Sequence, residues 1–451
     1  MTRRLLVANR GEIAVRIIRA ARDLGIETVA VYSSVDAESP HVSFADSAVE
    51  IGPGAASDSY LSIEAVLAAG RSSRVDAIHP GYGFLSERAE FAAACEAGGF
   101  IFVGPPSGVI QQMGDKVEAR GVALRAGIPT VPGSEGPIEQ VEDALSIANE
   151  IGYPVLLKAA GGGGGGGIRR VDDPSLLRAQ FSIATQEATA AFGDPRVYLE
   201  KFIERSRHVE VQILGDGTNV VHLLDRECSL QRRRQKMVEE ALSPGISNEM
   251  REAMTAAAVS LAASVGYSGA GTVEFIVDKD SSEFFFIEMN TRIQVEHATT
   301  ELVCGVDLVA AQLGIAFGDG LGIRQDEVSS RGWAIELRIC AEDPSNGFRP
   351  NPGRITDLCL PQGPWVRVDT WVEAGTVVSP YYDSLLAKLV VLGEDRESAI
   401  YRSRRALREF QLEGICTTIP MLRNVLEQQW FLSGDFDTRT LERFVNSGTS
   451  L

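Results

Sequence analysis

The sequence contains no apolar run that approaches about 20 residues, the length of a membrane-spanning helix. Its first apolar run, residues 5–8, is too short for the core of a signal peptide, and its six cysteines form no CxxC pair. We therefore expect buried, reduced cysteines, a cytoplasmic location and no membrane partner. Basic residues are in deficit, since 43 Lys and Arg face 61 Asp and Glu and give a net charge of −18. This acidity argues against a nucleic-acid partner, because binding to duplex phosphates needs a basic surface.

The sequence also has no internal repeat and no low-complexity tract apart from seven consecutive glycines at 161–167. Its 451 residues are enough for about three domains. A content of 44% hydrophobic and 23% charged residues is ordinary for a globular protein. We therefore expect several folded domains with their own cores.

The N-terminal region predicts a parallel α/β unit. A strand at residues 5–8, a tight turn, a helix at 12–24 and a strand at 27–33 follow one another, and the helix has one apolar face made by Ile13, Ile17, Ile18, Ala21 and Leu24. The turn lacks the G-x-G-x-x-G of dinucleotide binders, so we expect this unit to be mainly a scaffold. Residues 75–87 predict a strand that enters a glycine-rich loop at the carboxyl edge of the sheet, where ligands bind in such folds.

Residues 272–277 and 284–290 predict a β-hairpin whose second strand ends in polar side chains. With the turn centred on Ser281, Glu274 lies opposite Glu288, and Thr272 lies opposite Asn290, about 5 Å apart. Two carboxylates and an amide oxygen repel one another there unless a hard divalent cation, Mg²⁺ or Mn²⁺, lies between them. A solvated polar edge is an equally good interpretation of this segment taken alone.

A second candidate site begins at Lys158, which ends a predicted strand at 153–160 and leads into the glycine run. Successive glycine N–H groups can close over phosphates while the lysine supplies charge, although no G-K-[ST] follows as in a P-loop. A flexible linker is the alternative. The strand-like residues 168–171 after the run favour the phosphate loop.

Two further segments before residue 331 contain charged side chains that are candidates for a site. The predicted strand at 207–216 places three polar side chains on one face, namely His208, Glu210 and Gln212. A histidine in such a place is more often structural than catalytic. The basic cluster at 232–236 is either a salt-bridged face, with Glu239 and Glu240 as partners, or an anion site. From about residue 331 the sequence predicts strands followed by two helices, an α+β unit.

Taken together, the motifs of this chain resemble the biotin carboxylase family of the ATP-grasp superfamily. The matching strings are VANRGEIA, HPGYGFLSE, MGDK, YPVLLKAAGGGG, RHVEVQ, CSLQRR followed by QK and VEEA, EMNTRIQVEH, AEDP and PYYDS. Their order and spacing make the resemblance specific along nearly the whole chain. It implies a Rossmann-like N-terminal α/β domain at 1–113, an ATP-grasp region at 114–315 with a mobile glycine-rich lid at about 131–203, and an α+β biotin carboxylase C-terminal domain at 331–445.

The resemblance also implies the activity of an ATP-dependent ligase. Bicarbonate attacks the γ-phosphate of ATP to give carboxyphosphate, and the carboxyl group then passes to N1′ of biotin. The implied cofactors are ATP and Mg²⁺ or Mn²⁺, as two ions, with carrier-bound biotin as the substrate. We expect a homodimer that serves a multi-subunit acetyl-CoA or other acyl-CoA carboxylase. No A/M-K-M biotinylation signature occurs, so we expect the biotin carboxyl carrier protein and the carboxyltransferase on separate chains.

Position by position, the resemblance assigns residues to four sites. The metal ligands are Glu274, Glu288 and Asn290. The ATP site comprises Lys116, Lys158, Gly163, Gly164, Gly165, Gly166, Glu200, Lys201, Ile203, His208, Gln231, Arg234, Glu274 and Glu288. The bicarbonate site comprises Lys236, Arg292, Gln294 and Val295, and the biotin site comprises Tyr82, Arg338 and Asp383. The catalytic residues are Glu296 as general base with Arg292, Lys236 and Arg338.

The chain departs from the family pattern at the lid and near the nucleotide. Gly166 stands where the family usually has Arg or Lys, Ile168 replaces a usual Met, and Arg234 replaces an uncharged or weakly basic residue. Loss of the lid cation should weaken contact with the triphosphate, and Arg169 and Arg170 are candidates to compensate.

Two other functions fit parts of the sequence. Another ATP-grasp carboxylate ligase would share the nucleotide motifs, but not the segments around Tyr82 and Arg338. A degenerate nucleotide-binding regulatory subunit would bind ATP without hydrolysing it, because of the altered lid.

Overall fold

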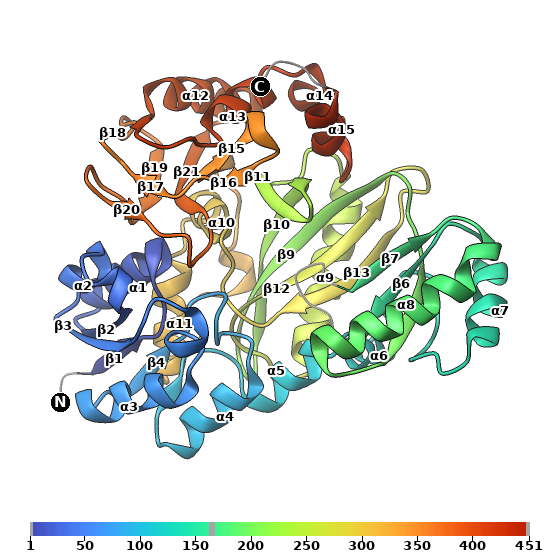
Figure 1. The fold of residues 1–451 in the computed structure, drawn as a ribbon, viewed down its shortest axis with the longest axis horizontal. Helices are drawn as coiled ribbons and strands as arrows, with labels where there is room; N and C mark the ends of the chain where they lie inside the picture. The colour runs from blue at the N-terminus through green and yellow to red at the C-terminus, as the bar shows by residue number, and fades with distance from the viewer. Residues whose placement is uncertain (1–2, 162–166, 448–451) are drawn as a thin grey trace.

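The computed structural model describes residues 3–161 and 167–447. The N-terminal part is a five-stranded parallel sheet in the order β3-β2-β1-β4-β5, as the sequence predicts for its first strands. Its strands are β1 (Arg4–Val7), β2 (Glu27–Ser33), β3 (Ser47–Gly52), β4 (Ala77–His79) and β5 (Ile101–Phe102). The helices of this part are α1 (Gly11–Asp23), α2 (Pro40–Phe44), α3 (Ile63–Ser73) and α4 (Ala89–Ala97). Figure 1 shows this part at one side of the molecule.

Helix α1 buries Ile13, Ile17, Ile18 and Ala21 in the N-terminal core, as its apolar face predicts. Leu24 was expected on this face but is 49% exposed. It lies beyond the last helical residue, as the C-cap, so the helical periodicity no longer directs its side chain inward.

The middle and the end of the chain share one eight-stranded antiparallel sheet, in the order β13-β12-β9-β10-β11-β14-β21-β19. Its strands are β9 (Ser206–Asp216), β10 (Val220–Arg232), β11 (Gln235–Ala241), β12 (Ser268–Asp278), β13 (Phe284–Asn290), β14 (Trp333–Cys340), β19 (Val366–Thr370) and β21 (Leu385–Gly393). Because β11 pairs with β14, side chains separated by about a hundred positions become neighbours on one face. Helix α9 (Asn248–Ser264) packs on β9 and β10.

The predicted hairpin is present as β12 and β13. Glu274 pairs with Glu288 and Thr272 with Asn290, so the expected register is confirmed. An irregularity in the pairing follows Glu274, at Phe275. The polar groups of the strand ends therefore lie on the same part of the sheet.

The glycine run connects two strands of a small antiparallel sheet, in the order β7-β6-β8. This sheet consists of β6 (Val155–Ala159), β7 (Ile168–Val171) and β8 (Val197–Lys201), with α7 (Val141–Ile151) and α8 (Pro174–Phe192) packed together beside it. The strands expected on both sides of the run are confirmed, and Lys158 pairs with Ile168. Figure 1 shows this unit projecting from the large sheet, away from the N-terminal part. Helices α5 (Ser107–Gly114) and α6 (Lys116–Arg125) precede it.

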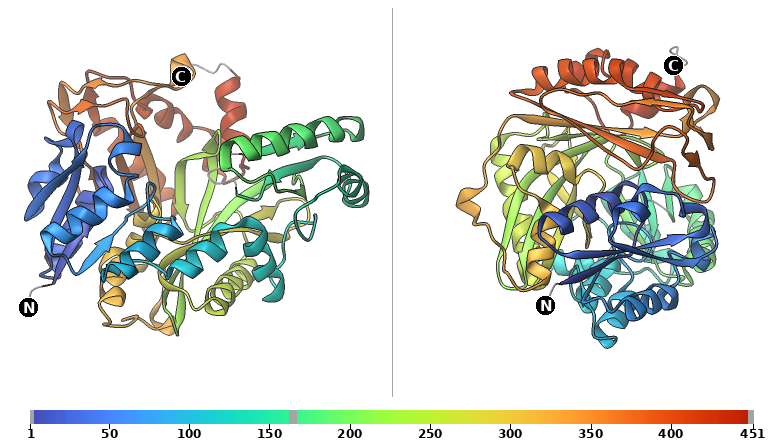
Figure 2. Two further views of the ribbon diagram at one scale, coloured as in Figure 1. Left: turned by 60° about the horizontal axis from the view of Figure 1, so that its bottom comes forward. Right: turned by 90° about the vertical axis from the view of Figure 1, so that its left-hand side faces the viewer.

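The C-terminal helices complete the α+β unit. Helix α12 (Arg396–Glu409) packs on β14 and β21, with α13 (Ile419–Val425), α14 (Gln429–Leu432) and α15 (Thr440–Asn446) beyond it. Figure 2 shows these helices together along one face of the sheet. Three two-stranded sheets complete this part: β15 (Glu342–Asp343) with β16 (Arg349–Pro350), β17 (Gly353–Arg354) with β20 (Val377–Val378), and β18 (Asp357–Cys359) with β22 (Gln411–Glu413).

In the described part of the chain, no single helix is long and apolar enough to cross a membrane. Helices α10 (His297–Cys304) and α11 (Leu308–Ala316) meet the length and composition criteria only as a pair, and that pair is bent by 96°. Both helices bury much of their surface inside the protein. The cytoplasmic location stays a prediction.

Candidate active site

The centre of the site is the ammonium group of Lys236 on β11, which is surrounded by three buried carboxylates. Its Nζ donates to Glu210 Oε2 at 2.5 Å, to Glu296 Oε1 at 2.7 Å and to Glu274 Oε1 at 3.3 Å. Burial by itself lowers the pKa of Lys236, but the acidic groups around it outweigh burial and hold the pKa well above its usual value. Lys236 is therefore a permanent cation at the floor of the site.

Glu296 connects this cation to a second one. Its other carboxylate oxygen, Oε2, accepts from Arg338 at 3.1 Å, while the Arg338 Nε donates to Glu239 at 2.5 Å. Burial raises the pKa of a carboxyl group, but Lys236 and Arg338 outweigh burial and hold the pKa of Glu296 well below its usual range. Glu296 is thus ionised and can accept a proton once an anion draws these cations away.

Arg226 on β10 contacts the central cluster but was not predicted from the sequence. It is fully buried and donates to Glu210, Gln294 and Gln212 at 2.6 Å each. It also donates to the hydroxyl oxygens of Thr300 at 2.9 Å and Thr272 at 3.1 Å. Arg226 therefore fixes Glu210 and Gln294 from behind the site.

The predicted metal ligands are brought together on the hairpin. Asn290 Nδ2 donates to Glu274 Oε1 at 2.8 Å, and Asn290 Oδ1 accepts from Arg292 at 3.0 Å. Glu288 contacts the Lys116 ammonium. Hard oxygen donors grouped on one face, with cations as their present partners, fit Mg²⁺ or Mn²⁺.

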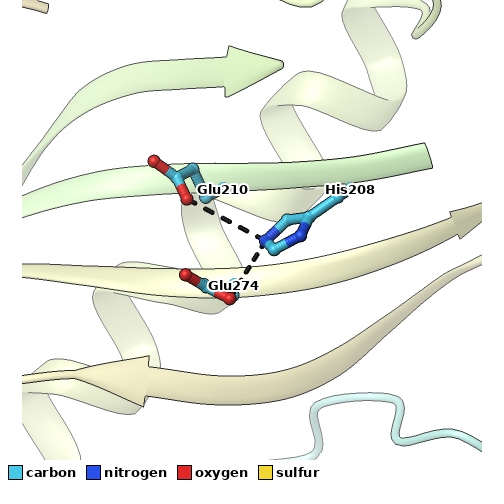
Figure 3. Close-up of side chains that lie close together, drawn as sticks. All are labelled: His208, Glu210 and Glu274. Carbon is cyan, nitrogen blue, oxygen red and sulfur yellow. Dashed lines mark ion pairs between the residues drawn. The ribbon is translucent and has the colours of Figure 1, made fainter. Parts of the chain in front are cut away.

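His208 joins this carboxylate group from β9, as Figure 3 shows. Its Nε2 lies 3.0 Å from Glu274 Oε2 and 3.9 Å from Glu210 Oε2. Burial lowers the pKa of His208, but the Glu274 carboxylate outweighs burial, and the net pKa is raised. The prediction that His208, Glu210 and Gln212 share one face of a strand is confirmed. The strand pattern could not predict that Glu274 is the partner of His208.

Two of the lysines predicted to contact the phosphates, Lys116 and Lys158, contact carboxylates that are themselves predicted ATP residues. Lys158 on β6 contacts Glu200 on β8, and the Arg120 guanidinium lies 3.5 Å from the same carboxylate. Lys201 instead donates to the backbone carbonyls of Gly152 and Tyr153, at 3.0 and 3.1 Å. The last four predicted residues of this loop, Gly163, Gly164, Gly165 and Gly166, lie outside the described residues.

The remaining nucleotide residues belong to the β10–β11 hairpin and to the end of the lid. Gln231 pairs with Lys236 across the two strands, and Arg234 lies in their turn with a φ of 67°. Ile203 follows β8 and is partly buried. The assignment of these residues to ATP stays a prediction.

A cavity of about 490 Å³ opens beside Arg338. It is lined by Tyr82, Arg292, Val295, Arg338 and Asp383, so the predicted biotin residues and half of the bicarbonate set lie around one space.

The Arg292 Nε donates to Glu87 at 2.8 Å, and the Tyr82 hydroxyl donates to Glu12. Aromatic rings of Phe84, Trp371, Tyr381 and Tyr382 form much of the wall of this cavity. An apolar wall with a few convergent polar groups is typical of small-molecule sites.

Of the two interpretations of the basic cluster at 232–236, the face of salt bridges with Glu239 and Glu240 is wrong, and the anion site stays a prediction. Glu239 pairs with Arg338, and Glu240 pairs with Arg396 at 2.7 Å. Lys236 of the cluster makes ion pairs at the centre of the site, whereas Arg232 stacks on the Phe348 ring at 4.1 Å. The pairing of β11 with β14 brings Arg338 to Glu239, whereas the partner of Glu240 comes from the start of helix α12.

The two lid arginines proposed to compensate for Gly166 have other partners here. Arg169 donates to Glu187 and to Gln180, each at 2.8 Å. Arg170 donates to Asp172 at 2.7 Å and to Glu204 at 3.0 Å. Both guanidinium groups therefore bind side chains of the protein in this structure and would have to leave them to bind a nucleotide.

Known families match almost the whole chain. Residues 1–110 match the description "Biotin carboxylase, N-terminal domain", and residues 336–443 match "Biotin carboxylase C-terminal domain". Residues 115–324 match "Carbamoyl-phosphate synthase L chain, ATP binding domain". "Biotin carboxylase 1" of Bacillus subtilis is 53% identical over 100% of both chains. "Biotin carboxylase" of Pseudomonas aeruginosa is 51% identical over 98% of each chain.

Solved structures agree over the same length. The biotin carboxylase domain dimer of the Hydrogenobacter thermophilus 2-oxoglutarate carboxylase, in complex with MgADP, ADP and bicarbonate, is similar with a TM-score of 0.94 and 47% identity over 98% of both chains. The biotin carboxylase–β-γ-ATP complex from Campylobacter jejuni has a TM-score of 0.95 and 42% identity, over 98% of this chain and 99% of that one. The predicted fold class is confirmed.

Proposed function

We propose, because this chain belongs to the biotin carboxylase family, that Lys236, Arg292 and Gln294 bind bicarbonate and that Glu296 takes its proton. The chain is an ATP-dependent ligase that carboxylates biotin, and it uses ATP and Mg²⁺. One observation carries the assignment of the base: Glu296 lies 2.7 Å from Lys236 and 3.1 Å from Arg338, beside the cavity that Tyr82 and Asp383 line. An anion bound to Lys236 lies within hydrogen-bonding reach of that carboxylate.

The proposed reaction begins with two anions that repel each other. Lys236 and Arg292 attract bicarbonate, and an Arg fork suits a planar oxyanion. Loss of its proton to Glu296 lets a bicarbonate oxygen attack the γ-phosphorus of ATP, which forms carboxyphosphate and releases ADP. Lys116 and Lys158 are close to carboxylates that they can exchange for phosphate oxygens.

Glu274, Glu288 and Asn290 would hold the metal, which neutralises charge on the phosphates when bound. The bond between the carboxyl carbon and the phosphate oxygen of carboxyphosphate then breaks, the carboxyl carbon forms a bond to N1′ of biotin in the cavity, and the released phosphate takes up the N1′ proton. There Arg338 is placed to stabilise the negative charge that biotin develops when its N1′ loses a proton.

The test measures ATP hydrolysis with Mg²⁺ as a function of bicarbonate, with and without free biotin. We expect hydrolysis that depends on bicarbonate and increases with biotin. Glu296→Gln should lower turnover about 10²- to 10⁴-fold, as is usual for a general base, with ATP binding intact. Glu204→Gln, which changes an exposed side chain in contact with Arg170 and Arg439, is the control. The proposal would be rejected if free biotin did not increase the rate of hydrolysis by folded wild-type protein, or if Glu296→Gln kept the full turnover.

We also propose a homodimer that carboxylates biotin on a separate carrier protein, with a separate carboxyltransferase. The similar Hydrogenobacter thermophilus biotin carboxylase domain is a dimer, which supports the first part, and the Bacillus subtilis relative, a biotin carboxylase that matches over its full length, supports the second. Light scattering should give twice the chain mass. A purified biotinylated carrier domain should become carboxylated in trans, and a monomer or an unmodified carrier would contradict this.

A further inference from the structure

Lys388 on β21 is fully buried and was not predicted to belong to the site. It nevertheless contacts the backbone of the segment that carries Glu296. Its Nζ donates to the backbone carbonyl of Val295 at 2.7 Å. It also lies 3.3 Å from Glu12 Oε1 and 3.7 Å from Asp369 Oδ2. Val295 lines the cavity and directly precedes Glu296. A single ammonium group therefore joins the C-terminal sheet, helix α1 and the segment that carries the proposed base.

The position of Lys388 in the sheet relates it to Arg338. The two residues lie opposite each other on β21 and β14. Arg338 binds the side chain of Glu296 at 3.1 Å, and Lys388 binds the carbonyl of the residue before it. Two opposed cations thus hold two consecutive residues, one through the carboxylate and one through the backbone. Like charges placed directly opposite are destabilising, so this arrangement needs a compensating cause.

Charge compensation alone does not account for the arrangement. Asp369 is already held by Arg367 at 2.7 Å. Glu336 faces the same region, but burial raises its pKa well above the usual value, and neither of its oxygens has a hydrogen-bond partner. Glu12 is the remaining counter-ion, and its Oε1 also accepts the hydroxyl of Tyr82. Lys388 is therefore connected to Tyr82 by way of Glu12. It is connected to Glu296 by way of the Val295 carbonyl.

We infer that Lys388 is a positioning residue for carboxylation: it fixes the Val295 carbonyl, and with it the Glu296 carboxylate, relative to Tyr82 and the cavity. This inference rests on the proposed function, because it assigns Lys388 a role only if Glu296 is the base. A purely structural Lys388 would serve as the counter-ion of Glu12 and nothing more. The two roles differ in what happens when both charges are removed together.

The experiment compares Lys388→Met/Glu12→Gln with Glu12→Gln alone. Lys388→Met by itself would leave Glu12 as an uncompensated buried charge and would unfold the protein more easily. In the double variant the amide introduced by Glu12→Gln still accepts the Tyr82 hydroxyl. Asp369 loses its longer contact with Lys388 but keeps Arg367, so the donation to the Val295 carbonyl is the main interaction that the comparison removes. Lys279→Met is the matched control, because Lys279 also donates to a carboxylate and a carbonyl, those of Asp435 and Phe436, far along the chain from the site.

For each variant we would measure thermal unfolding, ATP affinity, and kcat and KM for bicarbonate in biotin-stimulated ATP hydrolysis. We expect the double variant to melt close to Glu12→Gln and to bind ATP equally well. Its kcat should fall about 10²-fold below that of Glu12→Gln, the usual cost of misplacing a catalytic group by about 1 Å. Lys279→Met should retain the wild-type kcat.

Equal kcat in the double variant and Glu12→Gln, within about twofold, would overturn the inference and leave Lys388 as a counter-ion. If the double variant does not fold, Lys388→Gln/Glu12→Gln repeats the comparison with a polar side chain that ends one bond short of the ammonium. Absence of biotin-stimulated hydrolysis in the wild-type protein would reject the proposed function instead, so the two failures are distinct.

Discussion

Glu274 and Glu288 lie opposite each other on β12 and β13, yet their carboxylates bind different cations. Glu274 is held by Lys236 and His208, whereas Glu288 contacts Lys116. These lysines supply the charge that a divalent cation would otherwise provide to the carboxylates. We therefore expect Lys236, His208 and Lys116 to exchange these ion pairs for other partners when metal and substrates bind.

Removal of one of these carboxylates should weaken the binding of the metal ion more than the binding of ATP. We expect Glu288→Gln to raise the Mg²⁺ concentration for half-maximal ATP hydrolysis at least about tenfold. The measurement is the Mg²⁺ dependence of hydrolysis at saturating ATP. Asp280→Asn in the turn of the same hairpin, where Asp280 makes an exposed pair with Arg205, is the control. An unchanged Mg²⁺ dependence in Glu288→Gln would exclude Glu288 as a ligand.

Arg226 should be the most costly single residue of the site to replace. Arg226→Met leaves Glu210 buried without its guanidinium partner, so we expect a loss of about 3–5 kcal/mol in the free energy of unfolding. Urea titration measures this loss. Arg324→Met removes an exposed pair with Asp326 and should cost less than about 1 kcal/mol. Arg226→Met/Glu210→Gln should recover part of the loss, and no recovery would show that hydrogen bonds rather than charge dominate.

The lid arginine Arg169 should matter little for ATP. Because its guanidinium is bound to Glu187 and Gln180, we expect Arg169→Ala to change the KM for ATP by less than about twofold. Lys158→Met should raise the same KM about 10- to 100-fold, through loss of a charge-assisted hydrogen bond. A comparable rise in Arg169→Ala would mean that Arg169 leaves Glu187 when the nucleotide binds.

His208 should make stability depend on pH. Its pKa is raised in the folded protein, mainly because the Glu274 carboxylate outweighs the burial that lowers it. The stabilisation is therefore complete below the unfolded pKa of about 6.5 and is lost as pH rises through the folded pKa. We expect the difference in unfolding free energy between wild type and His208→Gln to be larger at about pH 6 than at about pH 9.

His222 offers a control of opposite sign, since burial lowers its pKa. Its contribution to stability falls as pH decreases below the unfolded value, so the difference between wild type and His222→Gln should be smaller at the lower pH. Differences for both histidines that move in the same direction would contradict the assignment to Glu274.

Local pattern was enough for the first strands and helix of the N-terminal part, for the strands on both sides of the glycine run, and for the β12–β13 hairpin. Alternation and turn residues predicted β12 and β13 with Glu274 opposite Glu288, because strand register depends on neighbours in the sequence. The motifs around Tyr82, Lys236, Glu296 and Arg338 placed the site, and the structure brings them around one cluster and one cavity. Glu210 was visible in its strand, but only as one polar residue of an alternating face.

The choice of partner for each buried charge was decided by tertiary structure alone. In the sequence, Glu239 has four basic residues as near neighbours, yet it pairs with Arg338 because β11 lies beside β14. Arg226 and Lys388 gave no sequence signal, since an Arg or Lys in an alternating strand is equally compatible with a solvated face. Periodicity determines which side of a strand a residue occupies. Desolvation then makes pairing of the buried charges obligatory, and the sheet order, set by contacts far apart in the chain, selects the partner.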